Sequence, residues 1–291
     1  MLLGIVAAFC GTFFQSLNYC LIKDAELKFK LSGLRLFVAS HLFMGLFCLI
    51  PFLGFRLYEH FTMPIIIAAL KLDVVYLLGQ FLMFLAIKKS DPSVASPFLI
   101  LKLPIVAILA ISFMGESLNL IQIFSVISIV LLSLFYSAKK GIGLGILVLV
   151  LLSALCFAAC DLAVLNLAKL MPYESRFMQA LAATPIYFLT FLIFLIPFEL
   201  KTRCTLKEIY KTKYLGISWL LGVILIVTGF SLGGIIAANI ILSLRSLVTV
   251  ILVLVFFKAH LKGASPLANT KILIAFLLFL CVVLYYLSPL V

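Results

Sequence analysis

The chain has 291 residues, of which 66% are hydrophobic and only 11% are charged. Because a soluble domain carries roughly a quarter charged residues, this composition excludes a water-soluble body of this size and indicates an integral membrane protein. A net charge of +12 would suit nucleic-acid binding. However, the basic residues lie in short breaks between apolar segments, and no aromatic and basic stripe accompanies them, so we expect no nucleic-acid partner.

Apolar segments follow one another along the whole chain, each near the roughly 20 residues that cross a hydrocarbon layer. The predicted spans are residues 2–22, 32–54, 64–87, 92–114, 119–137, 141–168, 174–198, 214–237, 239–257 and 267–288. The break between the eighth and ninth spans, IAAN (236–239), has no charge, so nine spans are the alternative. We expect an all-α integral membrane protein of ten transmembrane helices.

The basic residues are distributed unequally between the two sides of the membrane. The loops after odd-numbered spans hold 15 lysines and arginines, including Lys139, Lys140, Lys258 and Lys262, whereas the other side holds 3. Such a bias sets topology. It predicts a multi-pass protein of the cell membrane (the inner membrane in a bacterium), with these loops in the cytoplasm beside anionic membrane lipid and both termini outside.

The sequence also contains an internal repeat. Three pairs of polar or small residues recur at an offset of 143 residues: Lys102 and Arg245, Asn18 and Asp161, and Gly79 and Gly222. A duplicated unit of five spans would lie upside down relative to the first copy, with a binding site between the halves near the midplane. We therefore predict two inverted five-helix repeats, residues 1–140 and 141–291.

Three motifs carry a resemblance to a known family. They are GTFFQSLN (11–18), GLRLFVAS (33–40) and SDPSVASPFLILKLPIVAILAISFMGESLNLIQ (90–122). With the five-plus-five plan, the chain resembles the drug/metabolite transporter superfamily, especially its EamA-type branch. The resemblance covers essentially the whole chain and implies a secondary transporter. Two departures are that Ala259 stands where the repeat would match Glu116, and that relatives are described with cytoplasmic termini.

Lys102 and Arg245 are the candidate substrate-binding cations. A lysine or arginine at the bilayer centre costs at least about 2.5–3.5 kcal/mol, so two equivalent ones predict a site for an anion such as a phosphate or carboxylate. Related sugar-phosphate and nucleotide-sugar transporters have basic residues in their fourth and ninth spans, which the resemblance carries over to these two residues. The alternative is internal pairing with Asp73 or Asp161.

Several uncharged or acidic residues complete the candidate site. Asp161 is the candidate coupling residue, because a desolvated carboxyl group can titrate near neutral pH; a salt bridge to Lys102 or Arg245 is its alternative role. Pro104 is expected to kink the fourth span beside Lys102. Further candidates for substrate binding are Gln15, Asn18, Gln80 and Asn239, and His41 and Gln179 are other polar residues that face either a cavity or a neighbouring helix.

No enzyme, nucleotide-binding or metal-binding motif is present, so we expect no catalytic residues, cofactor or metal. The first hypothesis is a secondary transporter that exchanges a small organic anion by alternating access. The second is proton-coupled transport of amino acids or of other neutral or zwitterionic metabolites, including solutes like S-adenosylmethionine. The third is a membrane scaffold or lipid-modifying enzyme. Small residues spaced by four (Gly229, Gly233, Ala237) serve packing within the fold or at a homodimer face.

Overall fold

A computed structural model describes residues 2–31, 33–89, 101–138, 143–256 and 268–287. They form the helices α1 (Leu2–Phe29), α2 (Gly33–Gly54), η1 (Leu57–His60), α3 (Met63–Lys89), α5 (Lys102–Met114), α6 (Leu120–Ala138), α7 (Leu144–Lys169), α8 (Arg176–Thr202), α9 (Leu206–Lys211), α10 (Lys213–Gly233), α11 (Ile235–Ser243), α12 (Arg245–Phe256) and α13 (Ala268–Leu287). No strand occurs in these ranges. The predicted loop residues Lys139, Lys140, Lys258, Ala259 and Lys262, and the start of the motif at 90–122, lie outside the described residues.

Six of the described helices are long and apolar enough to cross a membrane: α1, α2, α3, α7, α8 and α10, while α5 and α6 are shorter apolar helices. Large apolar side chains cover the outside, such as Phe113 (78% exposed) and Leu144 (77% exposed). Hydrocarbon, unlike water, solvates such a surface, and helices satisfy their own backbone polar groups there. The chain is therefore an all-helical, multi-pass membrane protein.

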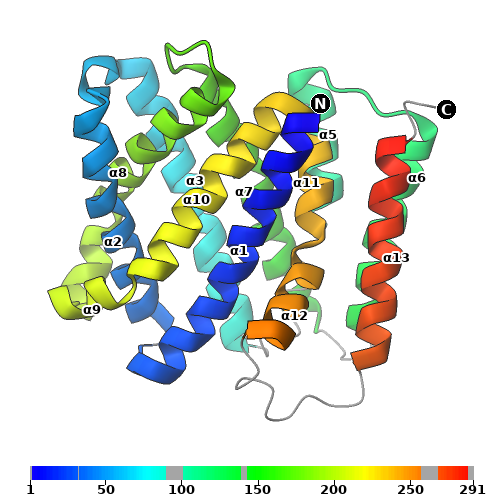
Figure 1. Ribbon diagram of the computed structural model, residues 1–291. Coiled ribbons are helices and arrows are strands. Elements are labelled where there is room, and N and C mark those ends of the chain that lie inside the picture. The colour runs from blue at the N-terminus through cyan, green and yellow to red at the C-terminus, as the bar shows by residue number, and fades with distance from the viewer. Residues whose placement is uncertain (1, 32, 90–100, 139–142, 257–267, 288–291) are drawn as a thin grey trace.

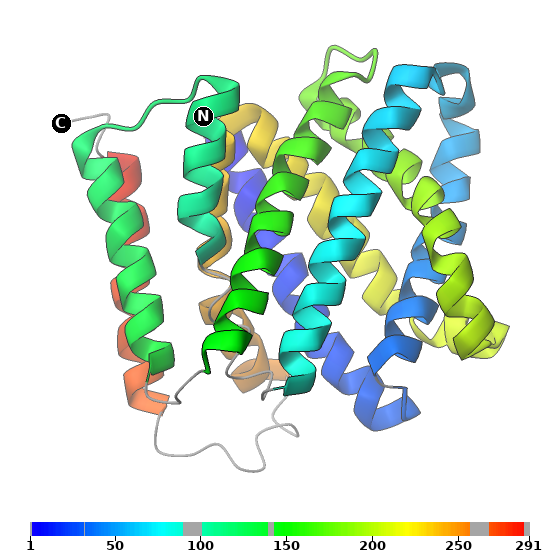
Figure 2. The same ribbon diagram turned by 180° about the vertical axis from the view of Figure 1, so that it is seen from behind.

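The helices are paired across the sequence rather than along it. Helix α1 packs against α10, α3 against α7, and α2 against α8, while α6 and α13 pack against each other and lie side by side at one edge of the molecule (Figures 1 and 2). Helix α1 begins, and α13 ends, at the same end of the bundle, and α9 lies at the opposite end (Figure 1). Each half of the chain is thus packed against the other half.

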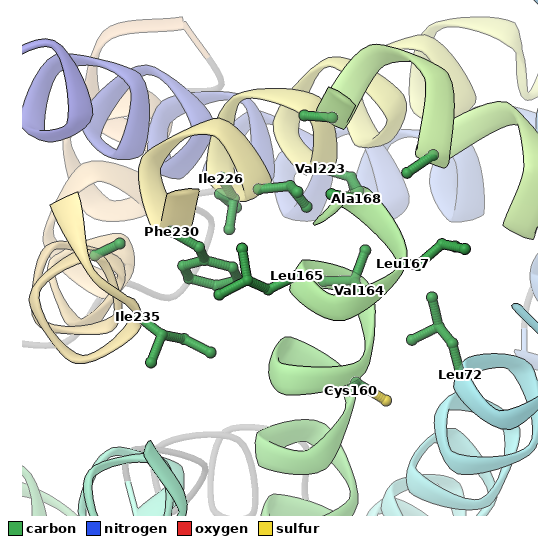
Figure 3. Packing of buried hydrophobic residues seen from close by; sticks show 14 of the residues in the cluster. Leu72, Cys160, Val164, Leu165, Leu167, Ala168, Val223, Ile226, Phe230 and Ile235 are labelled. Carbon is green, nitrogen blue, oxygen red and sulfur yellow. The ribbon is translucent and has the colours of Figure 1, made fainter. Parts of the chain in front are cut away.

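Helix α7 lies at the centre of the largest buried cluster. Leu165 is close to Phe230 and Ile226 of α10, and Cys160 lies on the side of α7 that faces Leu72 of α3 (Figure 3). All five side chains are at most 8% exposed. This apolar packing fixes the position of α7 between the two halves. It therefore also fixes Asp161, the residue that follows Cys160.

The helix ends differ from the predicted span ends at two places. The charged segment after residue 22 continues α1 as far as Phe29. The predicted break at 236–239 lies inside α11, because the chain breaks earlier, at Gly234, whose φ of +87° favours glycine. The first helix of that region therefore ends at Gly233, and Ala237 belongs to α11 and not to the helix that carries Gly229.

The break at Gly234 is closed by a side chain from the other half. The carboxylate of Glu116, which follows α5, accepts hydrogen bonds from the backbone N–H groups of Ile235 (2.9 Å) and Ile236 (3.4 Å). The first N–H groups of a helix have no partner within it, and an anion is favoured there. Glu116, in the first half of the chain, thus caps α11, which belongs to the second half.

Helix α5 begins at Lys102, part of the way along α7 (Figure 2). Pro104 is the third residue of α5. A proline in the first turn removes a donor that has no intrahelical partner, so Pro104 stands at a helix start and does not kink the interior of a described helix. Arg245 likewise begins α12, after Leu244 interrupts the helix.

Glycines bring α1 and α10 into close contact. A Cβ atom on Gly11 would lie 2.9 Å from the backbone N of Ile226 and 3.0 Å from the carbonyl oxygen of Gly222. A Cβ atom on Gly229 would lie 2.9 Å from Cβ of Ala8. Small residues let two backbones approach without a hydrophobic driving force. Gly229, a member of the predicted stripe of small residues, thus packs within the fold.

We expect Gly11→Ala to destabilise the protein by about 1–3 kcal/mol, because the added methyl group overpacks a rigid backbone contact. The measurement is the thermal unfolding midpoint of the purified protein in detergent. Gly145→Ala is the matched control, since a Cβ atom on Gly145 of α7 meets nothing within 4 Å. Equal midpoints for the two variants would contradict the close packing of α1 on α10.

The short helix α9 is fixed to α2 outside the membrane spans. Glu208 and Thr205 form a reciprocal capping box at its start, and Glu208 Oε2 lies 3.0 Å from Nη2 of Arg35. The backbone N–H of Thr205 and, after it, Arg35 hold the pKa of Glu208 below its usual range. A lowered pKa means that ionised Glu208 stabilises the folded state.

Glu208→Gln is expected to lower stability by at most about 1 kcal/mol at neutral pH, the usual size of a cap and an exposed pair. The difference between wild type and variant should be full above about pH 4.3, the ordinary pKa of glutamate, and vanish as the pH falls through the lowered pKa. Unfolding midpoints measured against pH test this. A difference that grows in acid would refute it.

Candidate functional site

The two charged residues Lys102 and Asp161 are joined across helices. Nζ of Lys102, at the start of α5, lies 2.6 Å from Oδ2 of Asp161 on α7, and the side chains are 18% and 14% exposed. Asp161 lies eight residues before the end of α7, or about 12 Å along a helix. Of the two carboxylates considered from the sequence, the structure therefore pairs Lys102 with Asp161 and not with Asp73.

Arg245 has only neutral partners among the described residues. Its Nη1 donates to Oε1 of Gln15 (2.9 Å), and its guanidinium lies 5.3 Å from the ring centroid of Tyr19. Gln15 and Tyr19 are four residues apart, so they share one face of α1. A hydrogen bond and a cation–π contact stabilise the guanidinium, but they leave its charge uncompensated.

A second hydrogen-bonded group joins α2 and α3. His41 Nδ1 is 2.8 Å from the carbonyl oxygen of Phe37, and Nε2 is 2.9 Å from the hydroxyl of Tyr76. Since a carbonyl only accepts, Nδ1 carries a hydrogen; in the neutral ring Nε2 then accepts from the Tyr76 hydroxyl. Gln80 lies four residues after Tyr76, so the two side chains share one face of α3.

Asp73 is the most deeply buried charged residue of this region, with 0% exposure. Its Oδ2 lies 2.6 Å from Oγ1 of Thr190 on α8. Cys160, the residue before Asp161, lies on the side of α7 that faces Leu72, the residue before Asp73 (Figure 3). Asp73 and Asp161 therefore lie on two helices, α3 and α7, that pack against each other.

Other residues predicted for the site are bonded elsewhere. The Asn18 amide donates to the carbonyl oxygen of Leu215 (2.6 Å) and to Ser218 (3.1 Å), and so holds α1 against α10. The Asn239 amide donates to Ile235 of its own helix (3.0 Å). Gln179 donates to the Tyr173 carbonyl (2.7 Å). These contacts use donors that a substrate would otherwise take.

Two cavities are present elsewhere on the molecule. One of about 400 Å³ is lined by Ser128, Leu131, Leu132 and Cys281 between α6 and α13. The other, of about 260 Å³, includes Glu116, Gln122, Tyr285 and Tyr286. The first is too apolar for a charged solute, and neither is lined by Lys102 or Arg245. In the described part of the chain, no group of His, Cys, Asp and Glu residues could hold a metal ion.

Two residues of this region were missed from the sequence. Tyr19 could have been found, because its spacing of four from Gln15 puts both on one helix face. Thr190 could not, since a threonine in an apolar helix usually bonds its own backbone, as Thr184 does here with the carbonyl oxygen of Ala180. Its second partner, Asp73, is visible only in three dimensions.

The Lys102–Asp161 pair gives a double-mutant prediction. Lys102→Ala or Asp161→Ala alone should destabilise the protein by about 1–3 kcal/mol, between the values for exposed and fully buried pairs. The double variant should lose less than the sum of the two, because neither charge is then left alone. Thermal unfolding midpoints of the four proteins test this. Strictly additive losses would show that the pair contributes no coupling energy.

No curated protein matches the chain. One crystal structure of a protein resembles it with a TM-score of 0.69 and 14% identity, covering 98% of this chain and 96% of that chain; at this identity the likeness shows the fold alone. Residues 2–138 match the EamA-like transporter family. The resemblance predicted from the sequence, to the EamA-type branch of the drug/metabolite transporter superfamily, is confirmed over residues 2–138.

Proposed function

We propose that the protein is a secondary transporter that exchanges a small organic anion, phosphorylated or carboxylated, across the membrane by alternating access. The single observation that carries this proposal is the uncompensated charge of Arg245. Its guanidinium contacts only neutral groups, Gln15 and Tyr19, in the described residues. An uncompensated arginine within a membrane bundle costs at least about 2.5 kcal/mol, and an anionic ligand would remove that cost.

Arg245 suits an anion better than Lys102 does. A guanidinium can bind a phosphate or carboxylate through two parallel hydrogen bonds. The ammonium of Lys102 is already neutralised by Asp161 at 2.6 Å, so an anion would have to compete with that carboxylate. We assign the primary contact to Arg245 and a secondary contact to Lys102, with Gln15 and Gln80 as neutral neighbours.

The charge balance supports exchange. Lys102, Asp161 and Arg245 together carry one net positive charge when no ligand is bound. A carrier that returned empty would move this charge through the hydrocarbon layer, whereas a carrier that returned with an anion would not. Because Lys102 is paired with Asp161, the cost of moving an uncompensated charge through the hydrocarbon layer comes from Arg245 alone.

Alternating access would move one half of the chain against the other. We propose ten membrane helices in two inverted halves, 1–140 and 141–291, with α11 and α12 as one interrupted span. In support, α1 of the first half packs on α10 as α7 of the second packs on α3, and each contact has a glycine at the 143-residue offset. A Cβ atom on Gly222 would lie 3.1 Å from Cγ of Gln15, and one on Gly79 would lie 3.1 Å from Cβ of Cys156.

The proposed topology keeps the loops after odd-numbered spans in the cytoplasm. The described basic residues Arg35, Lys201, Arg203, Lys207 and Lys211 belong to the ends of α2 and α8 and to α9. Helix α9 lies at the end of the bundle opposite the start of α1 (Figure 1). By the positive-inside bias, that end would face the cytoplasm and the chain termini would face outside.

The pair of Lys102 and Asp161 favours a second candidate function. Acid and base side by side could bind the ammonium and carboxylate groups of an amino acid or another zwitterion. In that case Asp161 would be a substrate ligand rather than a coupling residue. A purely structural ion pair would give the same geometry without transport, so the experiment must compare substrates and not only stability.

We expect Arg245→Gln to slow transport of labelled inorganic phosphate or acetate, the simplest anions of the two head groups, by about tenfold to a hundredfold. This range corresponds to about 1.5–3 kcal/mol for hydrogen bonds to a charged group. The measurement is uptake into proteoliposomes with and without the same anion inside. Equal uptake in both preparations would contradict exchange, and wild-type uptake by Arg245→Gln would contradict the anion site.

The matched control is Lys71→Gln, which removes a positive charge from an exposed position of α3 and should leave uptake unchanged. Labelled glycine distinguishes the second candidate. If glycine, and neither anion, is taken up, and Asp161→Asn abolishes this uptake, the substrate is a zwitterion.

A further inference from the structure

A second carboxyl group lies deeper than any of the proposed substrate contacts. Asp73 is 0% exposed and lies near the middle of α3 (Met63–Lys89). Thr190, its hydrogen-bond partner, lies near the middle of α8 (Arg176–Thr202). Both residues are therefore far from the ends of helices long enough to cross the membrane, where water or lipid headgroups could solvate a charge.

The surroundings of Asp73 offer no cation. The titratable groups that interact with it or its neighbours are Tyr76 of α3, Cys160 of α7, Tyr187 of α8, and His41 and Cys48 of α2. Both ring nitrogens of His41 are occupied, by the carbonyl oxygen of Phe37 and the hydroxyl of Tyr76, and neither contacts Asp73. Lys102, which interacts with Cys160, is already paired with Asp161. Among the described residues, no lysine or arginine forms an ion pair with Asp73.

The hydrogen bonds of Thr190 also favour a neutral Asp73. Oγ1 of Thr190 lies 2.6 Å from Oδ2 of Asp73, 3.0 Å from the carbonyl oxygen of Tyr187 and 3.3 Å from that of Ile186. A hydroxyl has a single hydrogen. If Asp73 is protonated, its O–H donates to Thr190, and Thr190 donates to Tyr187. If Asp73 is ionised, the hydroxyl cannot serve both acceptors.

An ionised Asp73 would also have a charged oxygen, Oδ1, that accepts no hydrogen bond. This atom is buried and has no hydrogen-bond partner among the described residues. An isolated carboxylate in an apolar interior costs so much that the group takes up a proton instead, whereas a neutral carboxyl group tolerates one unpartnered oxygen at far lower cost.

We propose that Asp73 is a proton-binding site that is occupied when α3 and α8 are packed together, and that it releases its proton when the two helices separate and water enters. Asp73 belongs to the first half of the chain and Thr190 to the second. Protonation would therefore favour the packed state, and deprotonation the open one. This deepens the proposed function, on which its role in transport rests, by adding a coupling proton at a residue other than Asp161.

The protonation state can be tested without a substrate. Infrared spectra of the full chain in nanodiscs at pH 7 should contain a carbonyl band of a protonated carboxylic acid that disappears in Asp73→Asn. The band should remain in Asp161→Asn, the matched variant of the paired carboxylate. A wild-type spectrum that loses no such band in Asp73→Asn would overturn the proposal.

The link to helix separation can be tested with a native thiol. Cys160 is 8% exposed and interacts with Asp73. In variants that retain Cys160 alone, we measure its labelling rate by a maleimide between pH 6 and pH 9, with Asp73 and with Asp73→Asn. Dividing the two rates removes the pH dependence that the thiol has in both chains. The charge of an ionised Asp73 disfavours the thiolate of Cys160, so this effect would lower the ratio and could not produce a rise.

The ratio should rise at least severalfold with pH, because only the chain with Asp73 can lose the proton and open. Cys20, a buried thiol on α1, is the control and should give a constant ratio. A constant ratio for Cys160 would overturn the coupling. Neither readout uses phosphate, acetate or glycine, so a failure of the proposed anion site leaves both tests intact and distinguishable.

Discussion

The cost of a charge in hydrocarbon governs the interior of this protein. Four charged residues within the described bundle show three solutions. Lys102 and Asp161 neutralise each other at 2.6 Å, Arg245 contacts an amide and an aromatic ring, and Asp73 contacts a hydroxyl. The first solution compensates a full charge, and the other two do not. The Lys102–Asp161 pair therefore needs no ligand to compensate its charges, whereas Arg245 suits an anion and Asp73 suits a proton.

The fold was more predictable than the contacts. Long apolar runs without charge predict membrane helices because the bilayer leaves the backbone no other way to satisfy its hydrogen bonds. Boundaries were less certain. Hydropathy placed a break at 236–239, whereas the backbone turns at Gly234, and a glycine with positive φ leaves no trace in hydropathy. The charged end of α1 stays helical to Phe29, where Asp24 and Lys28 form an ion pair one turn apart.

In the candidate site, too, the residues were more predictable than their contacts. The sequence identified Lys102, Arg245 and Asp161 from their charge, but it left open whether Asp73 or Asp161 pairs with Lys102. That choice depends on which face of α7 turns toward α5, and the apolar packing of α7 around Leu165 and Phe230 decides it. Asn18 was chosen as the repeat mate of Asp161, yet it holds α1 on α10. Sequence symmetry therefore does not guarantee equal roles, since the partners at the two positions differ.

The cap on α11 has a consequence for the integrity of the molecule. Glu116 of the first half supplies the acceptors for the first two N–H groups of a helix in the second half. If the chain were divided between residues 138 and 143 and the two fragments were produced separately, the second fragment would have a helix end with unsatisfied donors. Reassociation with the first fragment would restore both acceptors. The two halves of the chain thus depend on each other at this helix end.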